Sequence, residues 1–417
     1  MSEQPASLPN GFRDTPLGPL PEDWRVVRLG EIAEVKYGKA NPNDSGSIPI
    51  VGSGGIFANT STPLVTHPTL VIGRKGTAGK VWLFLSPCYP SDTTFYLHWK
   101  KEIDVSFVFY FLNLRPLSGE HAKTTLPSLQ KPYLENTSMP LPPLPEQRAI
   151  AHVLTSVQRA IEATEQVIAA TRELKKSLMR HLFTYGPVPP AAAESVPLQE
   201  TEIGPIPAHW QVVRLGEVAE VRAGVAFPPK YQGKATGKYP FFKVADMNAP
   251  GNERYMKNSN NWIHDDLLPI LKAKPFPKHT VIFPKVGGAL LTNKKRLLSR
   301  ESLVDNNIMG VIVQKRDRCI PEFCFCWFES IDIREFSNPG PLPSINAQTV
   351  KQSPIPLPPL PEQQRIAEML RAVDGKIQAE ERRKAALQSL FKSMLHYLMT
   401  GKVRVAGLVT PPTQPEE

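Results

Sequence analysis

Residues Trp24 to Ala40 read WRVVRLGEIAEVKYGKA, and residues Trp210 to Ala226 read WQVVRLGEVAEVRAGVA, with twelve of the seventeen positions identical. A second block, PLPPLPEQ, occupies residues 140–147 and returns letter for letter at residues 356–363. The offset between copies is 186 residues for the first block and 216 for the second, so the segment between the blocks is longer by 30 residues in the second copy. Two copies are too few for a solenoid, which needs about three repeats. The order constant, variable, constant predicts a pseudo-twofold molecule with two different variable domains. Each variable domain is flanked by a pair of constant blocks, 24–40 with 140–147 and 210–226 with 356–363, and each pair is called a frame.

The composition is that of a folded, basic protein. The 417 residues allow about two to four domains, and a hydrophobic fraction of 41% argues against a mainly disordered chain. The net charge of +10 favours a polyanionic partner, nucleic acid before membrane. No apolar run reaches the ~18 residues of a transmembrane helix, and the first residues lack the basic start and apolar core of a secretory signal. We therefore expect no membrane partner.

The cysteines bear on metal binding and on the compartment. Cys319, Cys324 and Cys326 lie in the apolar run CIPEFCFCWF, and Cys88 stands alone. No histidine stands beside them at the spacing of a metal site. Buried free thiols are expected, since unpaired cysteine behaves as a small buried hydrophobe. Free thiols persist in a reducing compartment, so the expected location is the cytoplasm.

Each copy of the first constant block predicts a strand followed by a short helix, because its apolar residues first run together and then recur at helical spacing. The variable segments are rich in glycine, proline, aromatic residues and short β-branched runs, which predict strands joined by loops. Core packing explains the repeated valines and leucines better than the repeated polar pairs Arg28/Arg214 and Glu31/Glu217. These polar residues are expected either to contact a partner or to fix the start of a helix.

The PLPPLPEQ block marks the start of a long helix in each copy. Prolines suit a first helical turn, and Glu146 and Glu362 place a carboxylate at the positive end of the helix. Downstream, apolar residues recur at alternating steps of four and three, which is the heptad rhythm of a coiled coil. The expected contact positions are Ile150, Leu154, Val157, Ile161, Ile366, Leu370, Val373 and Ile377.

A helix from about Glu146 to Phe183 would be about 57 Å long, too long to be buried by one small domain. We expect each helix to pair with its own repeat, antiparallel, as a strut between the variable domains. Packing of each helix onto its local domain alone is the alternative. The proline-rich stretch 186–207 is expected to be the linker between the copies.

The segment GRKGTAGK, residues 73–80, looks at first like the phosphate-binding loop of a nucleotide-binding protein. It fails that pattern, because Arg74 stands where the first glycine is needed and Val81 replaces the Ser or Thr that follows the lysine. A glycine-rich loop with Arg74, Lys75 and Lys80 suits DNA instead, since amides and cations contact phosphates and arginine reaches guanine.

The second variable segment carries a comparable cationic loop, in which Asn293 has the side chain for a two-point contact with adenine. Either loop by itself is more often a solvated surface loop, but their occurrence in both variable segments favours nucleic acid. The candidate DNA contacts are Lys39, Arg74, Lys75, Thr77, Lys80, Lys243, Lys285, Thr292, Asn293, Lys294, Lys295 and Arg296.

Catalytic motifs are not found in the sequence. It contains no HExxH, no GxSxG, no GxGxxG and no Asn/Asp-Pro-Pro-aromatic motif of a methyl-donor site. The short polar runs Asp305-Asn306-Asn307 and Asp265-Asp266 are typical of turns. We expect a chain without catalytic residues and without a metal.

At this point the chain resembles the DNA specificity subunit of type I restriction–modification systems over almost its whole length. The resemblance rests on the paired W-x-V-V-R-L-G-E blocks, the paired PLPPLPEQ blocks with their heptad helices, and the segments 72–76 and 281–295. It implies an α/β (α+β) fold with two target recognition domains of mixed and antiparallel sheets, joined by two long antiparallel coiled-coil helices. The expected parts are recognition domain 1 (1–145), spacer helix 1 (146–186), a linker with recognition domain 2 (187–355), spacer helix 2 (356–402) and a tail (403–417).

The resemblance also implies partners. Each recognition domain would read one half of a split site in double-stranded DNA, and the helices would set the gap between the halves. Two methyltransferase subunits, which carry S-adenosylmethionine, would attach to the duplicated constant regions, and two restriction subunits using ATP and Mg join such complexes in some systems. This chain would bind no cofactor itself.

Two other functions remain open from the residues alone. The first is an interaction scaffold built on the coiled coil, without direct DNA readout. The second is the recognition module of an enzyme whose catalytic domains lie on another chain. Dispensable loop cations would favour the scaffold, and the identity of co-purifying subunits separates the second from a specificity subunit.

Overall fold

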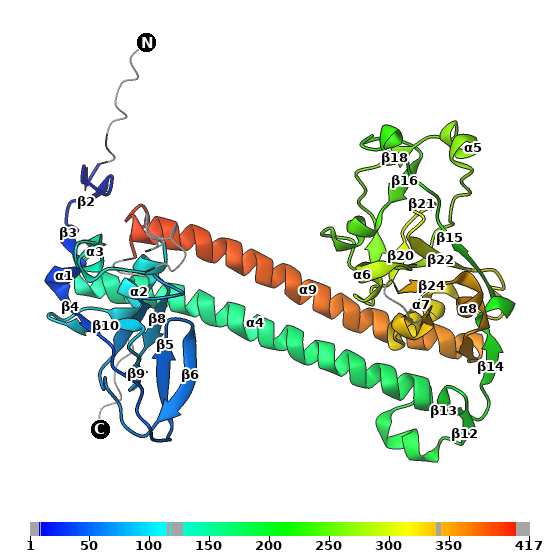
Figure 1. The fold of residues 1–417 in the computed structure, drawn as a ribbon, viewed down its shortest axis with the longest axis horizontal. Helices are drawn as coiled ribbons and strands as arrows, with labels where there is room; N and C mark the ends of the chain where they lie inside the picture. Colours follow the sequence, from blue (N-terminus) through cyan, green and yellow to red (C-terminus); the bar gives the residue numbers. More distant parts are fainter. Residues whose placement is uncertain (1–7, 9, 115–116, 118–127, 339–342, 406–417) are drawn as a thin grey trace, which may run out of the picture. The chain divides into compact units, whose positions relative to one another are not determined.

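The computed structural model describes residues 8, 10–114, 117, 128–338 and 343–405. The chain divides into two compact units (Figure 1). Unit 1 combines residues 1–166 with 381–417, and unit 2 comprises residues 167–380. Two long helices, α4 (Leu144–Tyr185) and α9 (Leu360–Met399), each belong in part to both units.

Unit 1 is built from short strands around one principal core. Its elements before α4 are β1 (Phe12–Arg13), β2 (Leu20–Pro21), β3 (Arg25–Arg28), α1 (Leu29–Ile32), β4 (Ala33–Tyr37), β5 (Ile48–Gly52), β6 (Gly55–Thr60), β7 (Thr69–Gly73), β8 (Val81–Phe84), β9 (Tyr89–Pro90), β10 (Thr94–Trp99), α2 (Val105–Leu114), α3 (Lys131–Glu135) and β11 (Ser138–Leu141). One sheet has the antiparallel order β4-β10-β7-β8. A second has the order β6-β5-β9, in which β5 and β9 are parallel.

Unit 2 repeats this plan with longer connections. Its elements between the long helices are η2 (Pro190–Ser195), β12 (Leu198–Thr201), β13 (Gly204–Pro207), β14 (Gln211–Arg214), η3 (Leu215–Glu217), β15 (Ala219–Ala223), η4 (Pro229–Tyr231), β16 (Tyr239–Phe242), η5 (Val244–Asn248), β17 (Tyr255–Met256), β18 (Trp262–Ile263), α5 (Leu267–Leu271), β19 (Val281–Pro284), α6 (Gly287–Leu290), β20 (Arg296–Leu298), β21 (Leu303–Val304), β22 (Ile308–Val313), α7 (Pro321–Ser330), η6 (Ile333–Phe336), β23 (Ser337–Asn338), β24 (Ser344–Ile345), α8 (Ala347–Gln352) and β25 (Pro354–Leu357). The main sheet is β15-β22-β19-β20-β17, and β18-β16-β21 matches β6-β5-β9, with β16 and β21 parallel. The predicted mixed and antiparallel sheets are confirmed.

The two constant blocks of each copy are paired strands. β3 pairs with β11, so that Arg28 faces Ser138, and β14 pairs with β25, so that Arg214 faces Pro354. Proline cannot donate to a sheet, and these two-stranded ladders leave room for it at an edge. Each variable domain therefore leaves the frame at one strand and returns at the strand beside it.

The helix after the first strand of each block is fixed by its own glutamate. Glu31 Oε1 accepts the backbone N–H of Arg28 at 3.1 Å, and Glu217 Oε1 accepts that of Arg214 at 2.8 Å. A carboxylate three residues into a helix that satisfies an amide at its start is a recurring capping arrangement. The structure thus gives these repeated glutamates the helix-fixing role.

The long helices run antiparallel. In unit 1 Lys384 Nζ lies 2.8 Å from Glu165, and in unit 2 Lys175 Nζ lies 2.7 Å from Asp374. Residue numbers therefore increase along α4 where they decrease along the facing part of α9. Of the predicted contact residues, Ile150, Leu154, Ile161, Ile366 and Leu370 are buried, and Val157, Val373 and Ile377 are partly buried. The antiparallel pairing predicted from the heptads is confirmed.

The cores explain the cysteines. Helix α7 packs into the main core of unit 2, where Cys319, Cys324 and Cys326 are fully buried beside Phe323 and Phe328. All four cysteines of the chain are free and buried, as predicted. Burial raises the pKa of the Cys88 thiol to about 12, which makes it a poor nucleophile. Among the described residues, no helix is long and apolar enough to cross a membrane.

Candidate nucleic-acid interface

A tryptophan of the first constant block holds a glutamate of the second in each copy. Trp24 Nε1 donates to Glu146 Oε2 at 2.9 Å, and Trp210 Nε1 donates to Glu362 Oε2 at 2.8 Å. Both glutamates lie in the first turn of a long helix. Sequence reasoning assigned these glutamates only to the helix end. The signal that could have revealed the pair is that both partners recur in both copies.

The remaining carboxylate oxygens meet different side chains in the two units. Arg404 donates from Nε to Glu146 Oε1 at 2.6 Å and also contacts Asp23, whereas His209 Nε2 lies 2.7 Å from Glu362 Oε1. Hydrogen bonds to Glu146 and Asp23 raise the pKa of Arg404 further above its ordinary value. The segment after α9 is therefore tied to the second constant block of unit 1 and to the residue that precedes the first block.

The glycine-rich segment of unit 1 is a loop between two strands, as predicted. It joins β7 to β8, and Gly76 and Gly79 have φ values of +73° and +84°, in the region that favours glycine. Arg74 is held in place, because its Nη2 donates to the Asp92 carbonyl at 2.7 Å and its guanidinium lies 5.2 Å from the Tyr37 ring centre. The candidates Lys75, Thr77 and Lys80 on the same loop are exposed.

Three other segments of unit 1 meet this loop. Thr93 accepts the backbone N–H of Arg74 through its carbonyl at 2.9 Å and the Ser53 amide through its Oγ1 at 3.3 Å. Lys39, which is exposed, forms a parallel bridge with Ser91. The ends of β4, β5 and β9 and the β7–β8 loop thus form one surface, called the basic face here, with the cations Lys39, Arg74, Lys75 and Lys80.

Unit 2 places Lys285 where unit 1 places Arg74. The Arg74 N–H donates to the Thr93 carbonyl and its carbonyl accepts from Leu129, and Lys285 makes the same two bonds to Asn307 and Ile345, at matching distances of 2.9 and 2.8 Å. The bridges Lys75–Ser128 and Val286–Ser344 follow one residue later in both units. Two of the candidate cations are therefore equivalent positions of a duplicated domain.

The rest of the second cluster differs from the predicted loop. The Ala-Leu-Leu run at residues 289–291 is a good helix former, and α6 forms there, followed by Asn293 at φ +53°, a left-handed position that asparagine tolerates after a helix. Asn293 Oδ1 accepts from Lys295 Nζ at 2.7 Å and from the Ile333 amide at 3.0 Å. The asparagine is therefore engaged within the domain.

Several other candidate residues of unit 2 are likewise engaged within the domain. Lys295 is 7% exposed and donates to the Ile331 carbonyl at 2.8 Å, and burial lowers its pKa to about 8. Arg296 donates to the carbonyls of Lys295 and Met247. Lys243 donates to Gln232 at 3.0 Å, Lys294 to Asn248, and the exposed Thr292 to the Ala289 carbonyl at 2.6 Å.

A cluster of four charges joins unit 2 to its segments of the long helices. Lys175 of α4 lies 2.7 Å from Asp374 of α9 and 2.9 Å from Glu329 of α7. Arg254 also contacts both acids, and its guanidinium stands 4.8 Å from the Phe325 ring centre. All four side chains are less than a quarter exposed. The cluster fixes the variable domain of unit 2 on those helix segments, and the heptad pattern does not reveal it.

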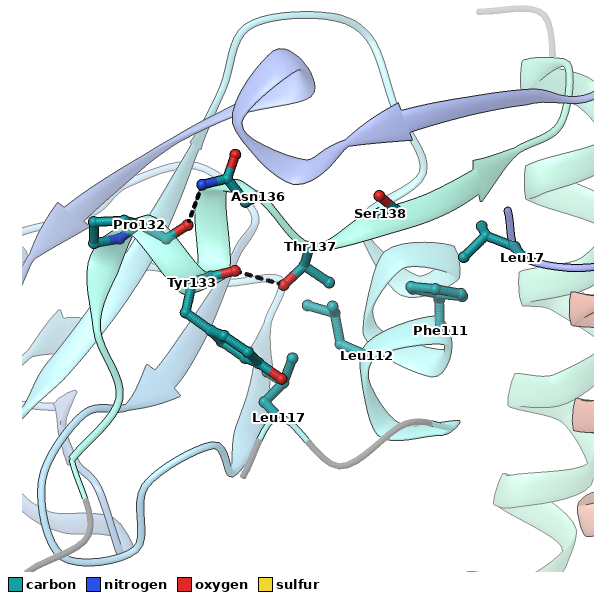
Figure 2. Close-up of a pocket in the computed structure, with 9 residues that line it drawn as sticks. All are labelled: Leu17, Phe111, Leu112, Leu117, Pro132, Tyr133, Asn136, Thr137 and Ser138. Carbon is teal, nitrogen blue, oxygen red and sulfur yellow. Dashed lines mark hydrogen bonds between the residues drawn. The ribbon is translucent and has the colours of Figure 1, made fainter. Parts of the chain in front are cut away.

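The cavity shown in Figure 2 lies elsewhere in unit 1. Its volume is about 560 Å³, and its lining includes Phe111 and Leu112 of α2 and Tyr133 of α3. Asn136 Nδ2 donates to the Pro132 carbonyl and Thr137 Oγ1 to the Tyr133 carbonyl, both at 2.9 Å. None of the nine lining residues carries a charge, so the cavity does not extend the basic face. Within the described part of the chain, no cluster of His, Cys, Asp or Glu is placed to hold a metal.

The fold and these surfaces define a duplicated frame that carries two unequal domains with basic residues at equivalent positions. The chain matches the type I restriction modification DNA specificity domain over residues 21–171 and again over residues 207–389. Because these matches span most of its length, the chain belongs to the family of type I restriction–modification DNA specificity subunits.

Two specificity subunits of other organisms match this chain over most of their own length. The chain is 24% identical over 414 residues to the type I restriction enzyme MjaVIII specificity subunit of Methanocaldococcus jannaschii, covering 93% of this chain and 95% of the relative. It is 21% identical over 377 residues to the EcoDI specificity subunit of Escherichia coli, with 84% and 81% covered. The fold is similar to the crystal structure of the S subunit from M. genitalium, with a TM-score of 0.62, 15% identity, and 94% and 97% of the chains covered.

A second solved chain, from a study of complex assembly and conformational transition in the type I restriction–modification system, gives a TM-score of 0.51. Its identity to this chain is 19%, with 92% of this chain and 99% of that chain covered. At these identities the solved structures support the fold of the chain.

Proposed function

We propose that this specificity subunit recognises a bipartite, asymmetric DNA site, each variable domain reading one half. The observation that carries the proposal is the equivalence of Arg74 and Lys285 on a duplicated frame. Equivalent placement supports the same role in both domains. The differing side chains and connections around these positions support different half-sites.

The contacts proposed for DNA divide by their surroundings. Lys39, Lys75 and Lys80 are exposed and suit phosphates, with Thr77 beside them. Arg74 is oriented by Asp92 and Tyr37, which suits a directed contact with a guanine edge. In unit 2 Lys285, Thr292, Lys243 and Lys294 remain candidates. Asn293, Lys295 and Arg296 are better explained as the scaffold that shapes that surface, because each is at least partly buried and bonds a backbone group of the domain. Lys243 and Lys294, by contrast, bond side chains only, and Thr292 is exposed.

The duplicated frames are proposed to bind two methyltransferase subunits, one at each pair of constant strands. These partners would carry S-adenosylmethionine, and restriction subunits, where present, would carry ATP and Mg. This chain would supply specificity without catalysing the reaction. The helices between the frames, residues 146–186 and 356–402 in the proposed division of the chain, would set the gap between half-sites. The tail at 403–417 begins with described residues that bind Glu146 through Arg404.

The test is DNA binding by the full chain in complex with methyltransferase subunits, measured over a range of salt concentrations. Replacing Lys75 and Lys80 together by alanine should flatten the slope of log affinity against log salt by about two units, one for each phosphate that the lysines no longer neutralise. The matched control is Lys101→Ala, an exposed lysine beyond the opposite end of β10.

Unchanged affinity and slope in the double variant would favour the scaffold function instead. Co-purification addresses the partners separately. Two methyltransferase subunits for each specificity subunit are expected, and a complex without a methyltransferase would contradict the proposal.

A further inference from the structure

Two large apolar side chains stand exposed on β6, in the hairpin that borders the basic face. Ile56 and Phe57 of β6 are 62% and 57% exposed. Residues 53–54 join β5 to β6 in a short turn, so Ile56 and Phe57 stand near the start of the second strand of this hairpin. Figure 1 shows the hairpin of β5 and β6 in unit 1. A single exposed apolar residue is ordinary, whereas adjacent ones at a tip point to a contact surface.

Phe57 belongs to the same surface as the cations. A Cβ placed on Gly52 would lie 3.2 Å from the Phe57 ring and 3.6 Å from Thr93 Oγ1. The Thr93 carbonyl accepts the Arg74 amide at 2.9 Å. The hairpin tip, the turn after β9 and the basic loop therefore form one continuous surface, and glycine at position 52 leaves space for the ring.

The cations extend to the other side of the tip. Lys80 Nζ stands 4.1 Å from the centre of the Trp82 ring, and that ring lies 3.1 Å from a Cβ built on Gly55. Apolar side chains flanked by exposed lysines match a ligand that offers both anionic groups and apolar groups. Duplex DNA has this combination in its major groove, where phosphates line the edges and thymine presents a methyl group.

We propose that the β5–β6 hairpin enters the major groove and that Ile56 and Phe57 contact thymine 5-methyl groups in the half-site read by unit 1. The inference rests on the proposed DNA-binding function and names the chemistry of one contact. The major groove admits a two-stranded β-ribbon. Lys75 and Lys80 hold the flanking phosphates, which positions the tip without reading sequence.

The contact belongs to unit 1 alone. In unit 2 the strands equivalent to β5 and β6 are β16 and β18, and residues 243–261 join them in place of the short turn. That connection carries η5 and β17. The second half-site is accordingly read by a different surface.

The experiment uses the complex of the full chain with its methyltransferase subunits and a duplex that carries its site, identified by sequencing methylated DNA. Each thymine of both half-sites is replaced in turn by uracil, which removes one methyl group. The wild-type complex should lose about fourfold in affinity when uracil replaces thymine at one or two positions of one half-site. That factor corresponds to the free energy of burying one methyl-sized apolar group. Phe57→Ala and Ile56→Ala should weaken binding to the thymine duplex and should each abolish the uracil effect at one position.

The control is Leu85→Ala, which removes an equally exposed leucine, 62% exposed, at the end of the β7–β8 hairpin away from the basic loop. It should bind every duplex as wild type does. Because the proposed contact is apolar, Phe57→Ala should leave the salt slope unchanged.

Uracil effects that persist in both variants, or a wild-type complex insensitive to uracil, would overturn the proposal. A second outcome separates the hairpin from the proposed function. If the Lys75→Ala, Lys80→Ala variant has a flatter salt slope but Phe57→Ala binds with wild-type affinity, the chain binds DNA and the hairpin does not contact it. If the lysine double variant and the Ile56 and Phe57 variants all bind DNA as wild type does, the proposed DNA-binding function is contradicted as well.

Discussion

The indole of Trp24 and the carboxylate of Glu146 join residues 122 positions apart in the sequence through one buried hydrogen bond of 2.9 Å. The strand leading into the variable domain is thereby tied to the first turn of α4. Trp24→Phe keeps the ring and removes the N–H, so one oxygen of a buried carboxylate is left without this donor. We expect a loss of about 1–3 kcal/mol in the free energy of unfolding, measured by chemical denaturation.

The control for this change is Trp82→Phe. Trp82 Nε1 is buried in unit 1 without a hydrogen-bond partner among the described residues. Removing that N–H should cost much less than removing the N–H of Trp24. Equal losses for the two variants would mean that the Trp24–Glu146 bond contributes nothing beyond ring packing.

The charge cluster of unit 2 should be costly to break at one member. Lys175→Met leaves Asp374 and Glu329 with one cation between them, and a loss of about 3 kcal/mol is expected for a partly buried cluster. Adding Asp374→Leu should recover part of that loss, because the excess negative charge is removed. A double-mutant cycle on the unfolding free energy measures the coupling.

An exposed ion pair provides the comparison. Lys384 and Glu165 lie 2.8 Å apart on the same two helices but are 33% and 48% exposed. Lys384→Met should cost less than about 1 kcal/mol, since solvent screens such pairs. A loss as large as that of Lys175→Met would show that burial is not the source of the difference.

The buried lysine of unit 2 predicts a pH dependence. Burial lowers the pKa of Lys295 to about 8, whereas in the unfolded chain the amine has its ordinary value of 10.5. Between these values the unfolded state binds more protons, so stability should rise with pH from about 8 to 10.5 and stay level below. Compared with Lys295→Met, the wild type should gain up to about 1.4 kcal/mol per pH unit in this window. Parallel curves for the two proteins would contradict the prediction.

Arg74 and Lys285 should affect different half-sites. Arg74→Ala is expected to relax base preference in one half only, and Lys285→Ala in the other half only, by about 1–3 kcal/mol at a base contact. Methylation patterns in cells that carry each variant give the result directly. Relaxation of both halves by one substitution would show that the two positions do not act separately.

The long helices should set the gap between the halves. One heptad added to both α4 and α9 lengthens each by about 10.5 Å, which matches about three base pairs. We expect a methylated motif with a longer gap and unchanged half-sites. A heptad added to α4 alone breaks the facing register and should abolish methylation, and a variant that keeps the original gap would contradict the prediction.

Local patterns predicted the frame well. Heptads and prolines are local signals, so the long helices, their pairing residues and the strand-then-helix blocks could be read from the sequence. Pairings between distant segments could not, which is why the Trp24–Glu146 bond and the charge cluster around Arg254 were missed. Charge by itself is also a poor guide to DNA contacts. The sequence does not distinguish an exposed lysine, such as Lys75, from a buried one, such as Lys295, when both lie in glycine-rich segments.

The pairing of Arg28 with Ser138, and of Arg214 with Pro354, has a consequence for heredity. The segment between the two residues of each pair begins and ends on neighbouring strands of the frame. A different segment could therefore take its place if its two ends lie equally close together. The entropic cost of closing such a loop grows slowly with its length, so inserts that differ by 30 residues are nearly equivalent for the frame. The repeated blocks are also alike in amino-acid sequence on both sides of the insert. Recombination between genes that encode such blocks would replace a whole variable domain in one event, and a cell lineage could acquire a new DNA specificity without altering the surfaces proposed to bind methyltransferase subunits.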